Sequence, residues 1–391
     1  MKTSIKLAKK NSHRPPKPHL LIIQQSPDWG GAEEWIASLV GEWAKKKINI
    51  TAYTNLPKLQ LSWQQSGARV YNIPFILDIM GNLRGLIKSI LLLPYAIFWY
   101  LKVLLLAKSR GVNLIVMSGF TEKLLVSWLS KIFSLPIIWF EYGDLKTIFT
   151  RNFYLPKIAY RLTKHIPQRV ITISSHTKNS LITDARVSLT KIKLIPPGVS
   201  IPKTFHSTDY PIVGHLSRLT PEKGQRHLLK AWKKVIKALP NAKLKIAGRG
   251  PDSKYLHQLA NKLNISESVE FLGFINKKAK FYNSLSLFIF PTIWEMEGFG
   301  IVAVEALSYG IPVVAYNTGP VPEIIDHTCG ITVPSENIHQ LAQAIINLLK
   351  NKRLRQKLSN KSKTKAKKQF NLTTQASKIT KELTCVLAEN Q

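Results

Sequence analysis

Residues 19–47 read HLLIIQQSPDWGGAEEWIASLVGEWAKKK. The first six form a short apolar run, SPDWGG supplies a glycine turn, and apolar side chains then recur with the spacing of one helix face. A strand that leads through glycine into an amphipathic helix is the repeating unit of parallel α/β sheets. We therefore predict a βα unit at this point of the chain.

The same unit returns further along. Apolar, β-branched-rich segments separated by helical stretches occur at 48–54, 113–119, 137–143 and 170–175. After SIPKTFHSTDYP (200–211), a linker-like stretch rich in Pro, Ser and Thr, the alternation restarts and continues to GITVP. The pattern predicts two doubly wound α/β domains whose strand ends face a shared cleft.

The chain divides into four parts on this basis. They are a basic solvated tail, a first Rossmann-like domain, a second Rossmann-like domain and a final helix that packs back on the first: 1–18, 19–205, 206–370 and 371–391. The tail has no apolar stretch of about 7–15 residues, so no secretory signal is indicated.

The charge balance is strongly basic. The chain of 391 residues has 56 Lys and Arg against 22 Asp and Glu, a net charge of +34, which favours anionic partners without choosing among them. Its two cysteines are too few for a disulfide framework or a metal cluster and indicate a reducing, cytoplasmic setting.

Residues 86–107, LIKSILLLPYAIFWYLKVLLLA, are nearly long and apolar enough to span a bilayer. Lys88, Pro94 and Lys102 interrupt the run, and a span would separate the two domains across the membrane. We expect a kinked helix packed in the first domain. The alternatives are a membrane-docking helix and, less favoured, a true span.

The strongest chemical signal is EMEGFGIVAVEALSYGIPVVA, residues 295–315. Glycines that open a helix leave backbone N–H groups free to approach a ligand, and the helix amino terminus favours an anion. Glu305 lies in an apolar helix, where a buried carboxylate needs partners, and a ribose would supply them. The alternative is structural: Glu297 stabilises the first helical turn, and Glu305 binds backbone or a basic side chain.

A second signal is VGHLSRLTPEKGQRHLL, residues 213–229. Arg218 and Lys223 follow a strand and precede a helix, where two cations suit a diphosphate. They are otherwise two of many surface cations. Gly30 and Gly31 form a further glycine turn at a helix start, while a DxD acid pair for a metal–nucleotide is missing from the sequence.

Taken together, these features resemble the retaining glycosyltransferases of family 4. The shared features are the early glycine pair, the G-x-L-x-R-x₄-K-G frame, E-x₇-E with EGFG, and the segments GRGP, VEFLGF and GIPVVAYNTGPVPEII. The resemblance covers about residues 19–370 and is strongest over 212–335. It implies a GT-B fold in which the second domain holds the nucleotide and the first holds the acceptor.

The resemblance also implies roles for particular residues. Arg218 and Lys223 would hold and stabilise the donor diphosphate, Glu297 would contact the transferred sugar, and Glu305 would bind the ribose. The remaining donor-side positions are Gly298, Phe299, Gly300, Ile275, Gly30 and Gly31. The implied reaction is front-face displacement with retention of configuration, without a metal or other cofactor.

One position departs from the family. Many members carry His at the end of the first-domain strand that here reads IIWFEYGD, and Tyr142 takes its place. Tyr142, Glu141 and Asp144 are candidates for binding the sugar or acceptor, or are polar residues of an ordinary loop.

The leading hypothesis is a retaining hexosyltransferase that moves a sugar from a UDP- or GDP-sugar to a glycan or lipid-linked acceptor. The alternatives are an inactive GT-B scaffold and a basic protein that binds nucleic acid or other anions. The basic run 350–368 contains no aromatic side chain for base stacking, so no nucleic acid is expected. The basic surface and residues 86–107 favour a peripheral site on the inner face of the membrane.

Overall fold

A computed structural model describes residues 17–26, 28–204 and 210–390. The expected basic tail therefore lies outside the described residues, apart from Lys17 and Pro18.

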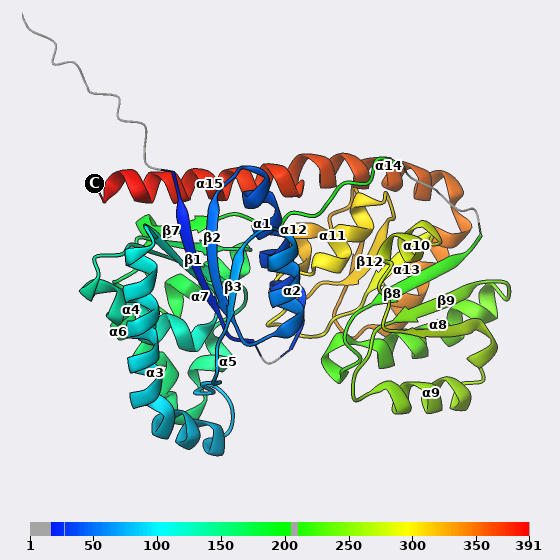
Figure 1. The fold of residues 1–391 in the computed structure, drawn as a ribbon. Coiled ribbons are helices and arrows are strands. Elements are labelled where there is room, and N and C mark those ends of the chain that lie inside the picture. The colour runs from blue at the N-terminus through cyan, green and yellow to red at the C-terminus, as the bar shows by residue number, and fades with distance from the viewer. Residues whose placement is uncertain (1–16, 27, 205–209, 391) are drawn as a thin grey trace, which may run out of the picture.

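The described residues form two wholly parallel sheets, one in each domain (Figure 1). In spatial order the first consists of β3 (Arg69–Asn72), β2 (Asn49–Thr54), β1 (His19–Gln24), β4 (Leu114–Met117), β5 (Ile137–Glu141), β6 (Arg169–Thr172) and β7 (Ile192–Leu194). The second consists of β10 (Val269–Gly273), β9 (Lys243–Ala247), β8 (Ile212–Leu216), β11 (Leu287–Phe290), β12 (Val313–Tyr316) and β13 (Gly330–Val333).

Helices connect these strands and cover both faces of each sheet. Those of the first domain are α1 (Gly31–Lys45), α2 (Pro57–Gln65), α3 (Leu83–Ser109), α4 (Phe120–Ile132), α5 (Lys146–Phe149), α6 (Leu155–Thr163) and α7 (Ser175–Thr183). The second domain has α8 (Gln225–Ala238), α9 (Ser253–Lys262), α10 (Lys278–Asn283), α11 (Ile301–Ser308), α12 (Val321–Ile324), α13 (Ile338–Lys350) and α14 (Lys352–Gln369). The chain then ends in α15 (Leu372–Glu389).

Strand order reverses once in each sheet. In the first sheet β1 lies between β2 and β4, and in the second β8 lies between β9 and β11. The registers Leu20↔Leu114 and Leu287↔Val213 mark these two switch points. Two doubly wound domains, as predicted from the alternation of strands and helices, are confirmed. Ligands of such sheets bind beyond the carboxyl ends of the strands at the switch point.

The two domains share one apolar core cluster. It contains Trp35 of α1, Phe299 before α11 and Leu383 of α15, all buried. Apolar side chains of both domains therefore exclude water together, so the carboxyl ends of the two sheets are held against each other.

The chain crosses between the domains twice, and the two crossings are hydrogen-bonded. The Val199 amide donates to the Phe370 carbonyl over 2.7 Å, and the Leu372 amide donates to the Val199 carbonyl over 3.0 Å. Beyond this point α15 packs on α1 of the first domain, as Figure 1 shows in red above the blue segments.

Helix α3 contains the apolar run found at 86–107. The Asn82 side chain accepts from the Gly85 amide over 2.8 Å and caps the helix, which continues through Pro94. Tyr100 and Leu104 are fully buried, whereas the Leu91 side chain is 76% exposed. One face of α3 belongs to the core, as expected, and the other is open. By length and composition α3 could cross a membrane.

Candidate functional site

Two loops meet at the switch point of the second sheet. Residues 217–224 follow β8 and lead through the short 3₁₀ turn η3 (Pro221–Lys223) into α8, while residues 291–300 follow β11 and lead into α11. Because β8 and β11 are paired, the sheet places these loops side by side. They carry six of the thirteen site residues predicted from the sequence, including all three proposed catalytic ones.

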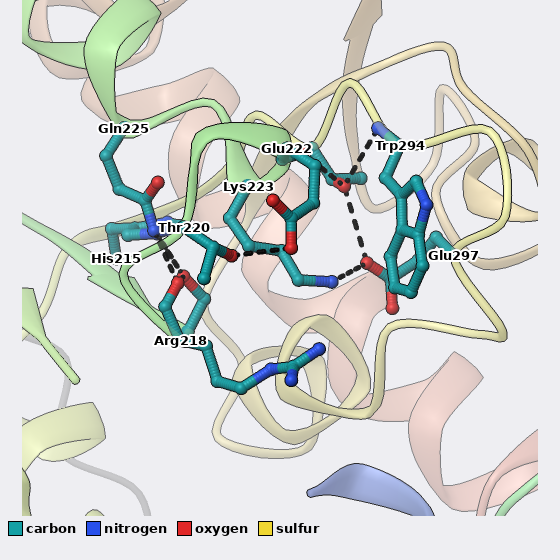
Figure 2. Close-up of polar contacts among 10 residues, drawn as sticks. His215, Arg218, Thr220, Glu222, Lys223, Gln225, Trp294 and Glu297 are labelled. Atoms are coloured by element: carbon teal, nitrogen blue, oxygen red, sulfur yellow. Dashed lines mark hydrogen bonds and ion pairs between the residues drawn. The ribbon is translucent and has the colours of Figure 1, made fainter. Parts of the chain in front are cut away.

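Lys223 and Glu297 form a partly buried ion pair between the two loops (Figure 2). The Lys223 Nζ lies 2.6 Å from Glu297 Oε2 and 4.6 Å from the centre of the Trp294 ring. The Thr292 hydroxyl donates to the same carboxylate over 3.3 Å. The pair therefore holds an ammonium group, oriented and partly desolvated, at the carboxyl edge of the sheet.

Arg218 lies beside this pair but is exposed. Figure 2 shows its side chain on the same side as the Lys223 amine, and no ion pair joins its guanidinium to another described residue. A guanidinium that remains open to solvent next to an oriented ammonium is a pair of donors for an anion with several oxygens.

Buried polar contacts fix the loop that carries Arg218. His215 is 1% exposed, with Nδ1 3.0 Å from the Ile289 carbonyl and Nε2 2.8 Å from the Ser217 hydroxyl. The Gln225 amide donates to the Arg218 carbonyl over 2.7 Å. Burial lowers the pKa of His215 to about 4, so the ring is neutral at pH 7.

Gly298 allows the second loop to approach the first domain closely. A Cβ at this position would lie 1.9 Å from the carbonyl oxygen of Tyr142, at the end of β5. Gly300 has a φ of 100°, in the left-handed region that favours glycine, and turns the chain into α11. Phe299 is buried and packs edge-on against Phe370. Its side chain therefore anchors the loop, while its backbone lies between Gly298 and Gly300.

Glu305 lies one and a half turns into α11 and has three polar contacts. Lys278 Nζ is 2.9 Å from Oε1 and 3.2 Å from Oε2, and the Tyr282 hydroxyl donates to Oε2 over 2.8 Å. The same Lys278 amine lies 2.6 Å from the Glu34 carboxylate of α1. In this structure Glu305 therefore has the basic partner that the structural alternative required.

The two carboxylates around Lys278 govern its protonation. Burial alone would lower the pKa of Lys278, but Glu305 and Glu34 more than offset that effect and raise it. Lys278 is thus a firmly charged link between the domains. Ile275, three residues earlier in the loop after β10, packs at the margin of the shared core.

The glycine pair of the first domain faces α11. Gly30 is the N-cap of α1, and its amide donates to Glu33 Oε2 over 2.9 Å. A Cβ on Gly31 would be in ordinary contact, 3.5 Å, with the Ile301 side chain. The amino termini of α1 and α11 therefore face each other across the domain boundary.

The three acceptor candidates differ sharply in their surroundings. Glu141 is 4% exposed and lies 2.9 Å from Lys123 Nζ, and it accepts from the Tyr160 hydroxyl over 2.8 Å. The Tyr142 hydroxyl is buried without a hydrogen-bond partner, its ring packs edge-on against Trp35 at 5.7 Å, and burial raises its pKa.

Asp144 is only partly buried. Its Oδ1 accepts from the Lys146 amide over 2.6 Å and from the Ser180 hydroxyl over 3.0 Å, and its Oδ2 lies 3.4 Å from His176 Nε2. Of the side chains of Glu141, Tyr142 and Asp144, that of Asp144 is therefore the most accessible to a ligand. The His176 imidazole lies beside it.

Four site residues were missed from the sequence. They are His176 beside Asp144, Lys278 and Glu34 beside Glu305, and Glu323, which accepts from the Ser175 and His176 amides over 2.8 and 2.9 Å. Lys278 and Glu34 are separated by 244 positions, and local spacing carries no signal for such a pair. The described residues contain no group of three or more His, Cys, Asp or Glu side chains that could hold a metal ion.

This arrangement defines a class of protein. Two facing doubly wound domains make up the GT-B fold, and in this chain the second domain has a cationic loop and a carboxylate loop at its switch point. Residues 199–365 match the family described as Glycosyl transferases group 1.

Relatives named glycosyltransferases match between a third and a half of the chain. An uncharacterized glycosyltransferase of Haemophilus influenzae is 34% identical over 153 residues, which are 39% of this chain and 42% of that protein. A GDP-mannose-dependent monoacylated alpha-(1-6)-phosphatidylinositol monomannoside mannosyltransferase of Corynebacterium glutamicum is 35% identical over 147 residues, 36% of this chain and 38% of that protein. The chain thus spans about two fifths of the length of these relatives.

Solved structures match nearly the whole fold. HepE of Anabaena in complex with UDP superimposes with a TM-score of 0.78 at 20% identity, covering 94% of this chain and 100% of that one. Sucrose-phosphate synthase of Thermosynechococcus elongatus gives 0.75 at 18% identity, covering 95% and 100%. At this level of identity the likeness shows the fold alone.

Proposed function

We propose that the protein transfers a sugar from a UDP- or GDP-sugar to a glycan or lipid-linked acceptor, with retention of the anomeric configuration. The observation that carries this proposal is the Lys223–Glu297 pair beside the exposed Arg218, at the switch point of the second sheet. The solved HepE structure is a complex with UDP, and the Corynebacterium relative is named as GDP-mannose-dependent; both support a nucleotide-sugar donor.

In the proposed reaction the bond between the anomeric carbon and the diphosphate oxygen breaks, and its electrons leave with the nucleotide. Arg218 and Lys223 stabilise the charge that develops on the departing diphosphate. Glu297, which already orients Lys223, contacts hydroxyls of the sugar. The acceptor hydroxyl attacks from the same face and passes its proton to the diphosphate.

The other roles follow from position. Glu305 exchanges part of its contact with Lys278 for the ribose hydroxyls, and the amides of Gly298, Phe299 and Gly300 face the sugar and phosphates. Ile275, Gly30 and Gly31 complete the donor side. Asp144, with His176 beside it, orients the acceptor, whereas Glu141 supports the strand end through Lys123.

We further propose that no metal or other cofactor takes part, since the sequence has no DxD pair, and that the protein works in the cytoplasm at the inner face of the membrane. The relative from Corynebacterium is named for a phosphatidylinositol-linked acceptor, which supports a lipid-linked one here.

Nucleotide binding tests the donor site directly. Thermal unfolding is measured with UDP, GDP and ADP in EDTA, and again with Mg²⁺, for the unchanged protein and for Arg218→Ala/Lys223→Ala. A nucleotide at about 100 times its Kd adds about 2.7 kcal/mol, which raises Tm by on the order of 5 °C for a chain of this size. We expect one nucleotide to give this rise in EDTA and the double variant to lose it.

Lys233→Ala/Lys234→Ala is the matched control, because it removes two exposed cations from α8 of the same domain. It should keep the full shift. If no nucleotide stabilises a protein that circular dichroism shows to be folded, the inactive-scaffold alternative replaces the proposal.

A further inference from the structure

A large apolar face lies open on the first domain. It is formed by the outer sides of α3, α4, α6 and the short turn η1 (Asn152–Tyr154), and it is defined here by Leu91, Phe98, Ile132, Phe153, Ile158 and Leu162. Phe153 is 88% exposed and Phe98 69%. Single exposed apolar side chains are common on protein surfaces, but a group of large ones on one face indicates an interaction surface. We call it the α3–α6 face.

The elements of this face are joined to one another. Arg151 and Asn152, at the start of η1, donate to the carbonyls of Met80 and Ile79 just before α3, over 2.9 and 2.8 Å. The Trp128 indole of α4 donates to the Thr163 hydroxyl of α6 over 3.1 Å. Figure 1 shows α3, α4 and α6 together on one side of the first domain. The exposed side chains therefore belong to one surface.

The most exposed of them is held in a costly conformation. Asn152, Phe153 and Tyr154 have successive φ values of 43°, 56° and 62°, in the left-handed region that residues other than glycine rarely adopt. Such backbone persists only where the surroundings enforce it, and it concentrates at functional surfaces.

The same segments are basic. Residues 83–164 contain twelve Lys and Arg against three acidic residues, Glu122, Glu141 and Asp144, none of which is exposed. Arg84, Lys88, Lys102, Lys131 and Arg151 are all exposed. An apolar face with cations among and around it matches a bilayer with anionic headgroups, whose acyl region takes the apolar side chains.

We propose that the α3–α6 face docks the protein on the surface of an anionic lipid bilayer, with α3 lying along the interface. Two copies of the chain facing each other through this surface would bring like charges together, which disfavours self-association. A true span would require α3 to pull Tyr100 and Leu104, both fully buried, away from the sheet.

The α3–α6 face is close in the sequence to the loop that carries the acceptor candidate Asp144. Asp144 is followed at once by α5, and η1 begins eight residues after it. A bilayer on this face would present a lipid-linked acceptor to the end of β5. That last step rests on the proposed function; docking itself does not.

Vesicle flotation tests the docking. The full chain is mixed with vesicles of phosphatidylcholine alone or with 30% phosphatidylglycerol, at 50 and 500 mM salt. We expect binding to the anionic vesicles, several-fold weaker at high salt because exposed charges are screened. Leu91→Gln/Phe153→Gln should weaken binding at least tenfold, since two large side chains no longer insert.

Leu61→Gln/Leu189→Gln is the matched control, because it makes two other exposed apolar side chains of the same domain polar, away from this face. It should bind as the unchanged protein does. Absent binding to anionic vesicles, or equal binding by Leu91→Gln/Phe153→Gln, would overturn the proposal. If the protein stays on the vesicles after a wash with alkaline carbonate, which removes peripheral proteins, docking is overturned in favour of a membrane-spanning α3. The nucleotide-induced Tm rise should persist in Leu91→Gln/Phe153→Gln, so loss of docking and loss of the donor site are distinguishable.

Discussion

His215 shows how one buried side chain controls the chemistry of its neighbours. Its Nδ1 faces the Ile289 carbonyl and must carry the proton, so Nε2 is the unprotonated nitrogen and lies 2.8 Å from the Ser217 hydroxyl, which also contacts the Arg218 carbonyl over 2.8 Å. The loop that begins with Ser217 bears Arg218. A second proton on the ring would turn the Nε2 acceptor into a donor and place a charge in an apolar site next to Lys223.

We predict that this ring makes stability depend on pH. The folded-state pKa of about 4 lies below the unfolded value of about 6.5, so the contribution is complete above pH 6.5 and is lost as the pH falls toward 4. A shift of this size corresponds to about 3 kcal/mol. Urea unfolding at pH 7 and pH 4 should show a loss for the unchanged protein that exceeds the loss for His215→Asn by about that amount. Equal losses would contradict the prediction.

At the scale of elements, the loop between β11 and α11 links the two domains through backbone alone. Gly298 passes so near the Tyr142 carbonyl that no side chain fits between them. The end of β5, where the acceptor candidates lie, thereby touches the loop that carries Glu297. The proposed donor loop and the acceptor candidates approach each other because Gly298 has no Cβ at this contact.

We predict that Gly298→Ala separates these elements. The added methyl would require the Tyr142 carbonyl to move, at a cost of about 1–3 kcal/mol, and sugar transfer should fall at least tenfold. Gly41→Ala within α1 is the control, because its methyl would lie 3.7 Å from the nearest atom; it should keep full transfer activity and raise stability by roughly 0.5–1 kcal/mol, since Ala favours a helix interior over Gly. Urea unfolding and a transfer assay check both, and an active Gly298→Ala would refute the role given to the close approach.

At the scale of the whole molecule, two polar bridges supplement the shared apolar core. Lys278 joins Glu34 to the second domain, and the Glu323 carboxylate of α12 receives both free amides at the start of α7. Both bridges lie at the domain boundary near the candidate site. Any movement of the two domains away from each other would break or stretch both bridges.

We predict that Glu323→Gln weakens this contact between the domains. The side-chain amide of the variant has only one accepting atom and no negative charge to complement the positive end of the α7 dipole. We expect the contact to weaken by about 1 kcal/mol. Hydrogen exchange at the Ser175 and His176 amides should accelerate about fivefold. Glu270→Gln, which changes an exposed acid on β10 of the same domain, should leave that exchange unchanged; acceleration in both variants would point to charge alone.

Much of this molecule could be predicted from local patterns. The strand at 137–143 was expected because it is a continuous apolar run, and β5 ends within it at Glu141. The loops bearing Arg218, Lys223 and Glu297 were expected at strand ends, and the pairing of β8 with β11 brings them together. Their catalytic and binding roles remain predictions.

The amino-acid sequence by itself determined the two doubly wound domains, their order and the candidate donor loops, because hydrophobic period and glycine placement act over a few residues. Only the tertiary structure decided which groups pair across the domains. Lys278 of the second domain reaches Glu34 of the first, and Glu323 caps α7. Within single domains, packing also decided that Lys278 contacts Glu305 and that Glu141 is buried against Lys123. Packing likewise decided that one face of α3 is exposed, because the sequence of an apolar helix does not show whether one of its faces or both are covered. These contacts depend on how helices and sheets pack within each domain and across the boundary, and no local spacing encodes that packing.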